Sequence, residues 1–324
     1  MANALVEAKL GSLDLLSSTS YTSKDVDFEH DFSVLSANFA PLFGIPEPIP
    51  NYPTAVFDGS DNSGFIQEFR LSSADDAARL RWIVGAYYSQ FRQKSAEYID
   101  SAAFAADIAE LYGDPSLADP ALYRFDQRTQ DEQTAVFGEV TLRLLPALEV
   151  IAGLRGYWLE SSLENVQSGL YAAASQPHTS ARQDGVNPRL VLNYHATDDV
   201  LIYATGARGY RPGGPNVGLP ENLGCALGDA YRPLFDPDSV WNYELGVKSQ
   251  FFDRRATLNV AGYRIDWQDV QQAVADPVCG SLFFANFGEA RSEGVEVELS
   301  VKPVESLLLN ASASYTDAGD SVLM

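Results

Sequence analysis

Hydrophobic and polar residues alternate along much of the chain, and the segment from Gly294 to Asp317 shows this most clearly. Its first half divides into two sets of alternate positions, one apolar and one polar: Val295, Val297, Leu299 and Val301 against Glu296, Glu298, Ser300 and Lys302. Successive side chains of a β-strand leave opposite faces, so a period of two predicts a strand. The pattern resumes after a turn at Lys302 to Glu305, which predicts a β-hairpin.

The same hairpin pattern recurs along the sequence and predicts about twelve strands. We expect tight turns at Gly11-Ser12, Ser73 to Arg79, Leu145 to Ala147, Ala196 to Asp199, Phe252 to Arg255 and Lys302 to Glu305. The hairpins are joined by long segments rich in Gly, Pro, Asp, Asn and Ser, which predict loops at Asp25 to Ser63, Ser95 to Arg128, Asn165 to Gln183, Arg211 to Ser239 and Ala273 to Asn286. Within the second loop, Ser101 to Leu111 is predicted to form a short helix.

Alternation alone fits both a soluble β-sandwich and a transmembrane β-barrel. Two features favour the barrel. Several predicted strands exceed ten residues, enough to cross a bilayer at a tilt, whereas strands of soluble proteins usually have about 5 to 6. All the tight turns also fall at one end of the hairpins and all the long loops at the other, as in outer-membrane barrels. We therefore predict an all-β, antiparallel, up-and-down transmembrane β-barrel.

Composition excludes several other classes. The 324 residues include 44 Asp and Glu against 22 Lys and Arg, a net charge of -22, which argues against a nucleic-acid partner. No segment approaches the roughly 18 to 20 continuous apolar residues of a transmembrane helix. The first residues lack the pattern of a signal peptide.

In a barrel, the apolar positions face lipid and the charged positions face the lumen. In the segment SVWNYELGVKSQFF, Tyr243, Leu245, Val247 and Phe251 share the predicted lipid face, and the charged residues share the other. The residues predicted to line the lumen are Glu68, Arg70, Glu139, Arg143, Arg155, Glu244, Lys248, Glu296 and Glu298. Aromatic residues near strand ends, including Trp158, Trp241, Trp267 and Tyr315, favour interfacial girdles, and the alternative is that aromatic residues are simply common in strands. In ATLNVAGYRIDW the alternation is less regular, and Gly262 is interpreted as a β-bulge.

Candidate binding residues lie where one strand enters a Gly-rich outer loop. Arg208, Tyr210 and Arg211 could hold an anionic ligand by charge-assisted hydrogen bonds and stacking, or could pair with neighbouring carboxylates as structural residues. Cys225 and Cys279 lie in two outer loops and either form a disulfide or remain separate thiols.

No other chemical site is predicted. The three histidines have no metal-ligand spacing, and the sequence Asp58 to Asn62 is interpreted as a turn, not a calcium loop. The sequence contains no nucleophile elbow, metal-binding box or catalytic triad pattern, so we expect no enzymatic activity, no metal site and no cofactor.

Several segments together resemble the barrel of TonB-dependent outer-membrane receptors. In order they are FIQEFRLSS, RLRWIVGAYY, TAVFGEVTLRL, LIYATGARGYRPGGPN, WNYELGVKSQFFDRRATLNVAGYRIDWQDVQ and ANFGEARSEGVEVELS. The resemblance implies a barrel of about 22 strands with an N-terminal plug, which the lumen-lining residues would contact. We expect residues 1–324 to be a partial barrel domain, because no plug, energy-coupling box or closing strand is found in the sequence.

The resemblance also implies a function and a location. It implies a receptor in the outer membrane of a Gram-negative bacterium, taking up a scarce ligand, most often a ferric siderophore or similar iron chelate. Its expected partners are the TonB-type energy-transducing complex, outer-membrane lipid and the chelate. A passive porin or fatty-acid channel is the alternative from the sequence, and a soluble β-rich binding protein is a third hypothesis.

Overall fold

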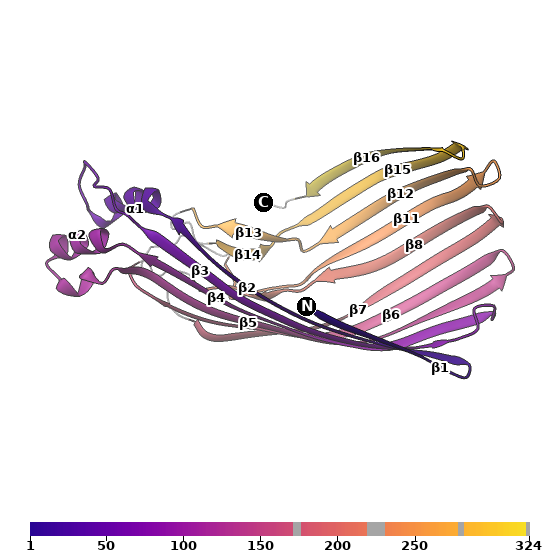
Figure 1. The fold of residues 1–324 in the computed structure, drawn as a ribbon, viewed down its shortest axis with the longest axis horizontal. Coiled ribbons are helices and arrows are strands. Elements are labelled where there is room, and N and C mark those ends of the chain that lie inside the picture. The colour runs from indigo at the N-terminus through magenta and orange to yellow at the C-terminus, as the bar shows by residue number, and fades with distance from the viewer. Residues whose placement is uncertain (171–175, 219–230, 278–281, 322–324) are drawn as a thin grey trace.

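The fold is a single large antiparallel sheet, seen in a computed structural model that describes residues 1–170, 176–218, 231–277 and 282–321. Twelve strands pair in the order β1-β2-β3-β4-β5-β6-β7-β8-β11-β12-β15-β16 (Figure 1). Each strand therefore pairs with the neighbours that precede and follow it along the chain, apart from the short strands inserted in two loops. The prediction of about twelve antiparallel, up-and-down strands is confirmed.

The strands of the large sheet are β1 (Ala2–Leu10), β2 (Leu13–Asp31), β3 (Ala55–Ser73), β4 (Leu80–Asp100), β5 (Ala121–Leu145), β6 (Leu148–Ser168), β7 (Gln176–Thr197), β8 (Val200–Arg211), β11 (Asp238–Phe251), β12 (Ala256–Gln268), β15 (Glu289–Val304) and β16 (Leu307–Ser321). The loops contain α1 (Ser33–Phe39), η1 (Ala40–Phe43), α2 (Ala102–Tyr112), η2 (Pro115–Ala118), and the short strands β9 (Gly214–Pro215), β10 (Leu234–Phe235), β13 (Gln271–Ala275) and β14 (Leu282–Asn286). No helix in the described part of the chain is long and apolar enough to cross a membrane.

All six tight turns lie at one end of the sheet and the longer connections at the other, as predicted (Figure 1). The strands reach further toward the loop end than the sequence pattern indicated. β2 to β7 have 19 to 25 residues each, whereas β8, β11 and β12 have 12 to 14. The predicted turn at Asp58 to Asn62 is wrong, because these residues continue β3 and pair with both neighbouring strands.

The pairing register defines two faces of the sheet. Residues directly opposite each other in antiparallel strands place their side chains on the same face. We call the face of Leu245 and Val247 the outer face, and the face of Glu244 and Lys248 the inner face. Val247 lies opposite Val260, which lies opposite Val297, while Lys248 lies opposite Asn259 and then Glu298. Apolar and charged residues are thus separated across neighbouring strands.

The outer face is apolar near the turns and polar beyond a row of aromatic residues. On β11 it carries Tyr243, Leu245, Val247, Ser249 and Phe251, a span of nine residues. A tilted membrane-spanning strand needs about 9 to 11 residues. Leu245 is 62% exposed. In water such exposure would be unfavourable, because a soluble protein gains free energy by burying an apolar side chain of this size. We call this apolar part, up to the row of Tyr88, Trp158 and Tyr243, the membrane belt.

Beyond the membrane belt, the outer face carries charge. On β5, Val136, Gly138 and Val140 are followed toward the loops by Glu132 and Arg128 at the same alternation. Ion pairs there link neighbouring strands: Arg182 Nη2 lies 3.1 Å from Glu160 Oε1, and Arg128 Nη1 lies 3.9 Å from Glu164 Oε2. In the loop-side half of these strands, both faces are therefore polar and suited to contact with water.

Strand β12 departs from the sequence interpretation. Its pairing with both β11 and β15 is regular through Gly262, so the predicted bulge is wrong. Tyr263, Ile265 and Trp267 lie on the inner face with Asn259, because Tyr263 is opposite Glu244. The irregular hydrophobic pattern arises because Arg264 and Asp266 occupy the outer face above the membrane belt, and Trp267 is not part of an outer girdle.

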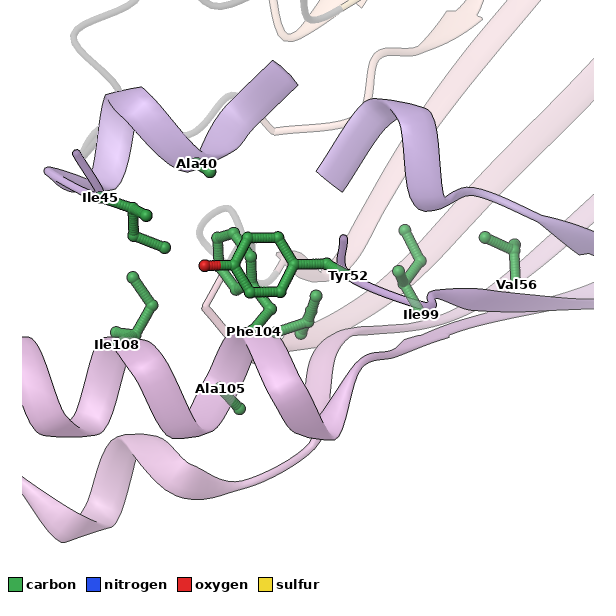
Figure 2. Packing of buried hydrophobic residues seen from close by; sticks show 9 residues of the cluster. Ala40, Ile45, Tyr52, Val56, Ile99, Phe104, Ala105 and Ile108 are labelled. Atoms are coloured by element: carbon green, nitrogen blue, oxygen red, sulfur yellow. The ribbon is translucent and has the colours of Figure 1, made fainter. Parts of the chain in front are cut away.

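At the loop end, two connections pack into a small lobe with its own hydrophobic core. The buried residues come from the β2–β3 and β4–β5 connections and the adjoining strand ends: Ala40, Ile45, Tyr52, Val56, Ile99, Phe104, Ala105, Ile108 and Leu122 (Figure 2). The ring of Phe104 meets those of Tyr52 and Phe43 edge to face, at centroid distances of 5.0 and 5.8 Å. The lobe therefore folds around contacts between two loops that are distant in sequence.

Helix α2 confirms the helix predicted near Ser101 to Leu111. Phe104, Ala105 and Ile108 share one face and are buried, and Gly113 ends the helix in a left-handed conformation (φ 65°). The hydroxyl of Tyr52 donates a 2.8 Å hydrogen bond to Asp107 Oδ2 on this helix. Burial, together with this carboxylate, raises the pKa of Tyr52 to about 12.

Candidate functional site

The nine residues predicted to line a lumen share the inner face. Glu68 lies opposite Tyr87, which lies opposite Ala135 and then Tyr157, so β3 to β6 contribute to one continuous surface. Several inner-face charges are paired across strands. Arg189 Nη1 of β7 lies 3.0 Å from Glu139 Oε2 of β5. Glu68 and Arg70 contact each other along the same strand, β3. The nine residues are Glu68, Arg70, Glu139, Arg143, Arg155, Glu244, Lys248, Glu296 and Glu298.

A cavity of about 700 Å³ opens on the inner face toward the loop end. Strands β4, β5 and β6 form its floor with side chains that include Tyr87, Asp131, Gln133 and Arg155. Segments β9, β10 and β14 close another side, and their contribution is mainly apolar. We call this cavity the inner chamber. Its size suits a small-molecule ligand, since ligand sites usually have about 300 to 1,000 Å³.

An aromatic and cationic cluster lies in the inner chamber. The Arg155 guanidinium carbon lies 4.8 Å from the ring centroid of Tyr87 and 5.9 Å from that of Phe137. The rings of Tyr157 and Tyr210 stack with centroids 3.7 Å apart and planes 3° apart. The ion pairs formed among the described residues do not include Arg155, so its N–H donors remain available to an anionic ligand.

Tyr210 reaches this cluster because β8 leaves β7 near its end. The pairing of β7 with β8 stops at Arg189 and Ala207, while β8 continues to pair with β11 as far as Arg211. Strict alternation would place Tyr210 with Trp241, on the outer face. Instead its ring lies on Tyr157, and its hydroxyl contacts the side-chain amide of Gln133.

Arg211 is held in a structural clasp at the same strand end. Its Nη2 lies 2.5 Å from Asp238 Oδ2 and 2.9 Å from the carbonyl oxygen of Gln271, and its guanidinium lies 5.2 Å from the Trp267 centroid. Asp238 is buried and also accepts the Gln271 N–H at 3.1 Å. The clasp joins the ends of β8 and β11 to hairpin β13–β14.

A second contact fixes the same hairpin over the inner chamber. The Asn216 side-chain oxygen accepts the Phe284 N–H, and its nitrogen donates to the Phe284 carbonyl, both at 2.7 Å. The amide thereby imitates the edge of a β-strand. Asn216 and Phe284 both line the chamber, so this contact shapes its wall.

The three binding residues predicted from sequence thus occupy different environments. Tyr210 lines the inner chamber, Arg211 belongs to the clasp, and Arg208 lies opposite Trp241 in register. Cys225 and Cys279 lie outside the described residues. Tyr87, Tyr157 and Gln133 were not singled out from the sequence, although the register of β4, β5 and β6 would have placed them beside Arg155. In the described ranges, no group of three or more His, Cys, Asp or Glu is arranged to hold a metal ion.

The long strands, two-sided pattern and one-ended turns define an outer-membrane β-barrel architecture, and comparison with known proteins gives the family. The family model for the TonB dependent receptor-like β-barrel matches residues 6–322. The chain belongs to this family of outer-membrane proteins of Gram-negative bacteria.

Relatives in this family are named as receptors. The chain is 25% identical over 280 residues to a probable TonB-dependent siderophore receptor, PiuA, of Acinetobacter baumannii, covering 80% of this chain and 36% of that protein. It is 28% identical over 233 residues to the pesticin receptor of Yersinia enterocolitica, covering 72% and 30%. The chain therefore spans about a third of the length of these relatives.

The fold is also similar to that of a solved receptor structure, and the chain again covers only part of it. The ferric yersiniabactin uptake receptor FyuA of Yersinia pestis superposes with a TM-score of 0.71 at 19% identity, covering 97% of this chain and 41% of FyuA. At this identity the likeness establishes the fold. The twelve strands correspond to less than half of that receptor chain.

Proposed function

We propose that the chain is part of an outer-membrane active transport receptor that takes up a ferric siderophore or a similar iron chelate, energised through TonB. The observation that carries the proposal is the inner chamber, where Arg155, Tyr87 and Tyr210 line the cavity on the loop side and Tyr157 stacks behind Tyr210. Anionic and aromatic chelates match cationic and aromatic side chains by charge-assisted hydrogen bonding and stacking. The name of the PiuA relative, a probable siderophore receptor, supports the same ligand class.

The proposed role of the inner face depends on closure of the sheet into a barrel. The large sheet has two edges, β1 and β16, whose outward backbone groups would be costly to leave unpaired in hydrocarbon. We propose that further strands close the barrel to about 22, and that residues 1–324 are the partial barrel domain. The nine inner-face residues would then line the lumen and contact a plug, whose rearrangement by the TonB-type complex releases the ligand inward.

Uptake of radiolabelled iron chelates tests the proposal. A strain lacking the full-length receptor gene is complemented with wild type, Arg155→Gln or the outer-face control Arg182→Gln, each with and without functional TonB. We expect uptake that requires TonB, and Arg155→Gln should weaken chelate affinity by roughly 10- to 100-fold, as for loss of a charged hydrogen bond. Arg182→Gln should leave affinity unchanged.

Two results would contradict the proposal. Uptake that persists without TonB would favour a passive channel, an alternative that the comparisons do not support. If wild type and Arg155→Gln bind the chelate with equal affinity, the inner chamber is not the binding site.

A further inference from the structure

A second cavity lies on the outer face, where the membrane belt ends. It has a volume of about 770 Å³, and its lining includes Trp241, Tyr243, Arg264, Asp266, Glu289 and Arg291. In register, Tyr243 is opposite Arg264, and Trp241 is opposite Asp266, which is opposite Arg291. These residues come from β11, β12 and β15 and are not used by the proposed chelate site on the inner face.

The position of this cavity is fixed by the membrane belt. The row immediately toward the turns consists of Leu245, Gly262, Val295 and Tyr315. Tyr243 and Arg264 are the first pair above it, and on β11 Tyr243 is eight residues from the turn-side end of the belt at Phe251. Aromatic side chains prefer this depth, at the level of lipid headgroups. The loop side of such barrels is extracellular, so the cavity lies at the headgroups of the outer leaflet.

Trp241 and Tyr243 form a stacked aromatic surface beside the guanidinium groups. The rings of Trp241 and Tyr243 are nearly parallel, with centroids 5.9 Å apart and planes 5° apart. Tyr243 is 46% exposed, so one side of this surface is open. A sugar ring offers apolar C–H groups that can lie against such rings, and its hydroxyl groups remain in water.

Asp266 orients the two arginines without using all their donors. Its carboxylate accepts Arg264 Nε at 2.9 Å and Nη2 at 3.2 Å, and Arg291 Nε at 2.7 Å. Glu293 lies farther away, at 3.7 Å from Arg264 and 4.0 Å from Arg291. Among the described residues, Arg264 Nη1 and both terminal nitrogens of Arg291 have no hydrogen-bond partner. Two adjacent guanidinium groups with free donors match the oxygens of a phosphate group.

We propose that Trp241, Tyr243, Arg264 and Arg291 bind the phosphorylated sugar headgroup of an outer-leaflet lipid. The site is continuous with the membrane belt below it. The acyl chains of the bound lipid would therefore lie against the apolar side chains of the belt. The arginines bind the phosphate, and the aromatic surface supports the sugar. This role is independent of the transported ligand and of the inner chamber.

Native mass spectrometry of the full-length receptor in detergent tests this site without any iron chelate. The probes are bisphosphorylated lipid A, its dephosphorylated form and inorganic phosphate. We expect wild type to bind bisphosphorylated lipid A at least ten-fold more tightly than the dephosphorylated form. The double variant R264Q/R291Q should lose at least ten-fold in affinity for the bisphosphorylated lipid.

Arg254→Gln is the matched control, since Arg254 is paired with Asp199 at 3.0 Å at the turn end, across the membrane. It should bind the lipid as wild type does. Equal affinity of wild type for the two lipid forms would overturn the proposal, and this comparison needs no variant to fold. Equal affinity of wild type and R264Q/R291Q would also overturn it. Displacement of the lipid by an equimolar amount of inorganic phosphate would indicate a free-phosphate site instead.

Discussion

The turn-side and loop-side halves of the long strands differ on one face only. On the outer face of β5, Val136 and Val140 lie in the membrane belt, while Glu132 and Arg128 lie beyond it. The inner face carries polar and charged residues in both halves, from Arg143 near the turns to Asp131 near the loops. Only the outer face passes from lipid to water along the length of a strand. The change from apolar to charged residues on that face therefore marks where the membrane ends.

The two halves are also stabilised differently. In the membrane belt, the exposed apolar side chains have few neighbours within the chain, and lipid is their solvent. The loop-side lobe instead buries a conventional core around Phe104, as a soluble domain does. Substitutions should therefore affect one half and spare the other.

The largest effect is expected in the lobe. Phe104→Ala removes a fully buried ring that contacts Tyr52 and Phe43, and should destabilise the lobe by about 3 to 5 kcal/mol. Hydrogen exchange of the full-length receptor should show faster exchange in α1 and α2, while the amides of the membrane belt stay protected. Val34→Ala, at a position 78% exposed, is the control and should change neither region. Uniform loss of protection in both halves would show that they are not separate units.

A charge placed in the membrane belt is the next largest perturbation. Val247→Arg should reduce the free energy of folding into lipid vesicles by about 2 to 4 kcal/mol, because the guanidinium would face hydrocarbon. Asn259→Arg introduces the same charge on the inner face, opposite Lys248 and Glu298, and should cost well under that amount. Urea titration of vesicle-bound receptor measures both. Similar values for the two variants would contradict the assignment of the faces.

The sequence predicted the strand number, the turns and the two faces because alternation is a local property. The segments around Val297 and Leu245 each carry the signal within a few residues. The same method failed on β12, where Arg264 and Asp266 on the outer face look like an interrupted lipid surface unless the end of the membrane belt is known. It also treated Asp58 to Asn62 as a turn, because polar residues on both faces resemble a loop when a strand continues into water.

The candidate site was less accessible to sequence reasoning. Arg155 was expected on the inner face, but its neighbours Tyr87 and Tyr157 come from strands whose register is a tertiary property. The position of Tyr210 depends on the separation of β8 from β7, which alternation cannot reveal. Likewise, the pairing of Arg211 with Asp238 depends on strand ends brought together by the sheet.

Alkaline pH offers a smaller effect confined to the lobe. Tyr52 has a pKa of about 12 in the folded chain, whereas an unfolded tyrosine titrates near 10. Between these values the unfolded state loses its proton first, so lobe stability should fall by up to a few kcal/mol as the pH rises from about 10 to 12. Hydrogen exchange or limited proteolysis of the lobe across this range checks the slope. Tyr52→Phe should flatten it, and an unchanged slope in that variant would exclude Tyr52 as the cause.

The smallest effect is expected at the wall of the inner chamber. Asn216→Ala removes both 2.7 Å hydrogen bonds to Phe284 and should destabilise the attachment of hairpin β13–β14 by roughly 1 to 3 kcal/mol. The Phe284 amide should then exchange faster, while the membrane belt is unchanged. Slow exchange of that amide in the variant would show that the remaining contacts, including the clasp at Arg211 and the hydrogen bonds of Asn286 with Asp236, hold the hairpin without Asn216.

The depth and direction of the outer face are tested most directly by spin labels on the full-length receptor in vesicles, with Cys225 and Cys279 replaced by serine. Single labels at positions 247, 248 and 130 compare the belt, the inner face and the outer face beyond the belt. We predict that the label at 247 collides with oxygen dissolved in hydrocarbon, while those at 248 and 130 collide with a water-soluble nickel reagent. A water-accessible label at 247, or a lipid-buried label at 130, would contradict the account.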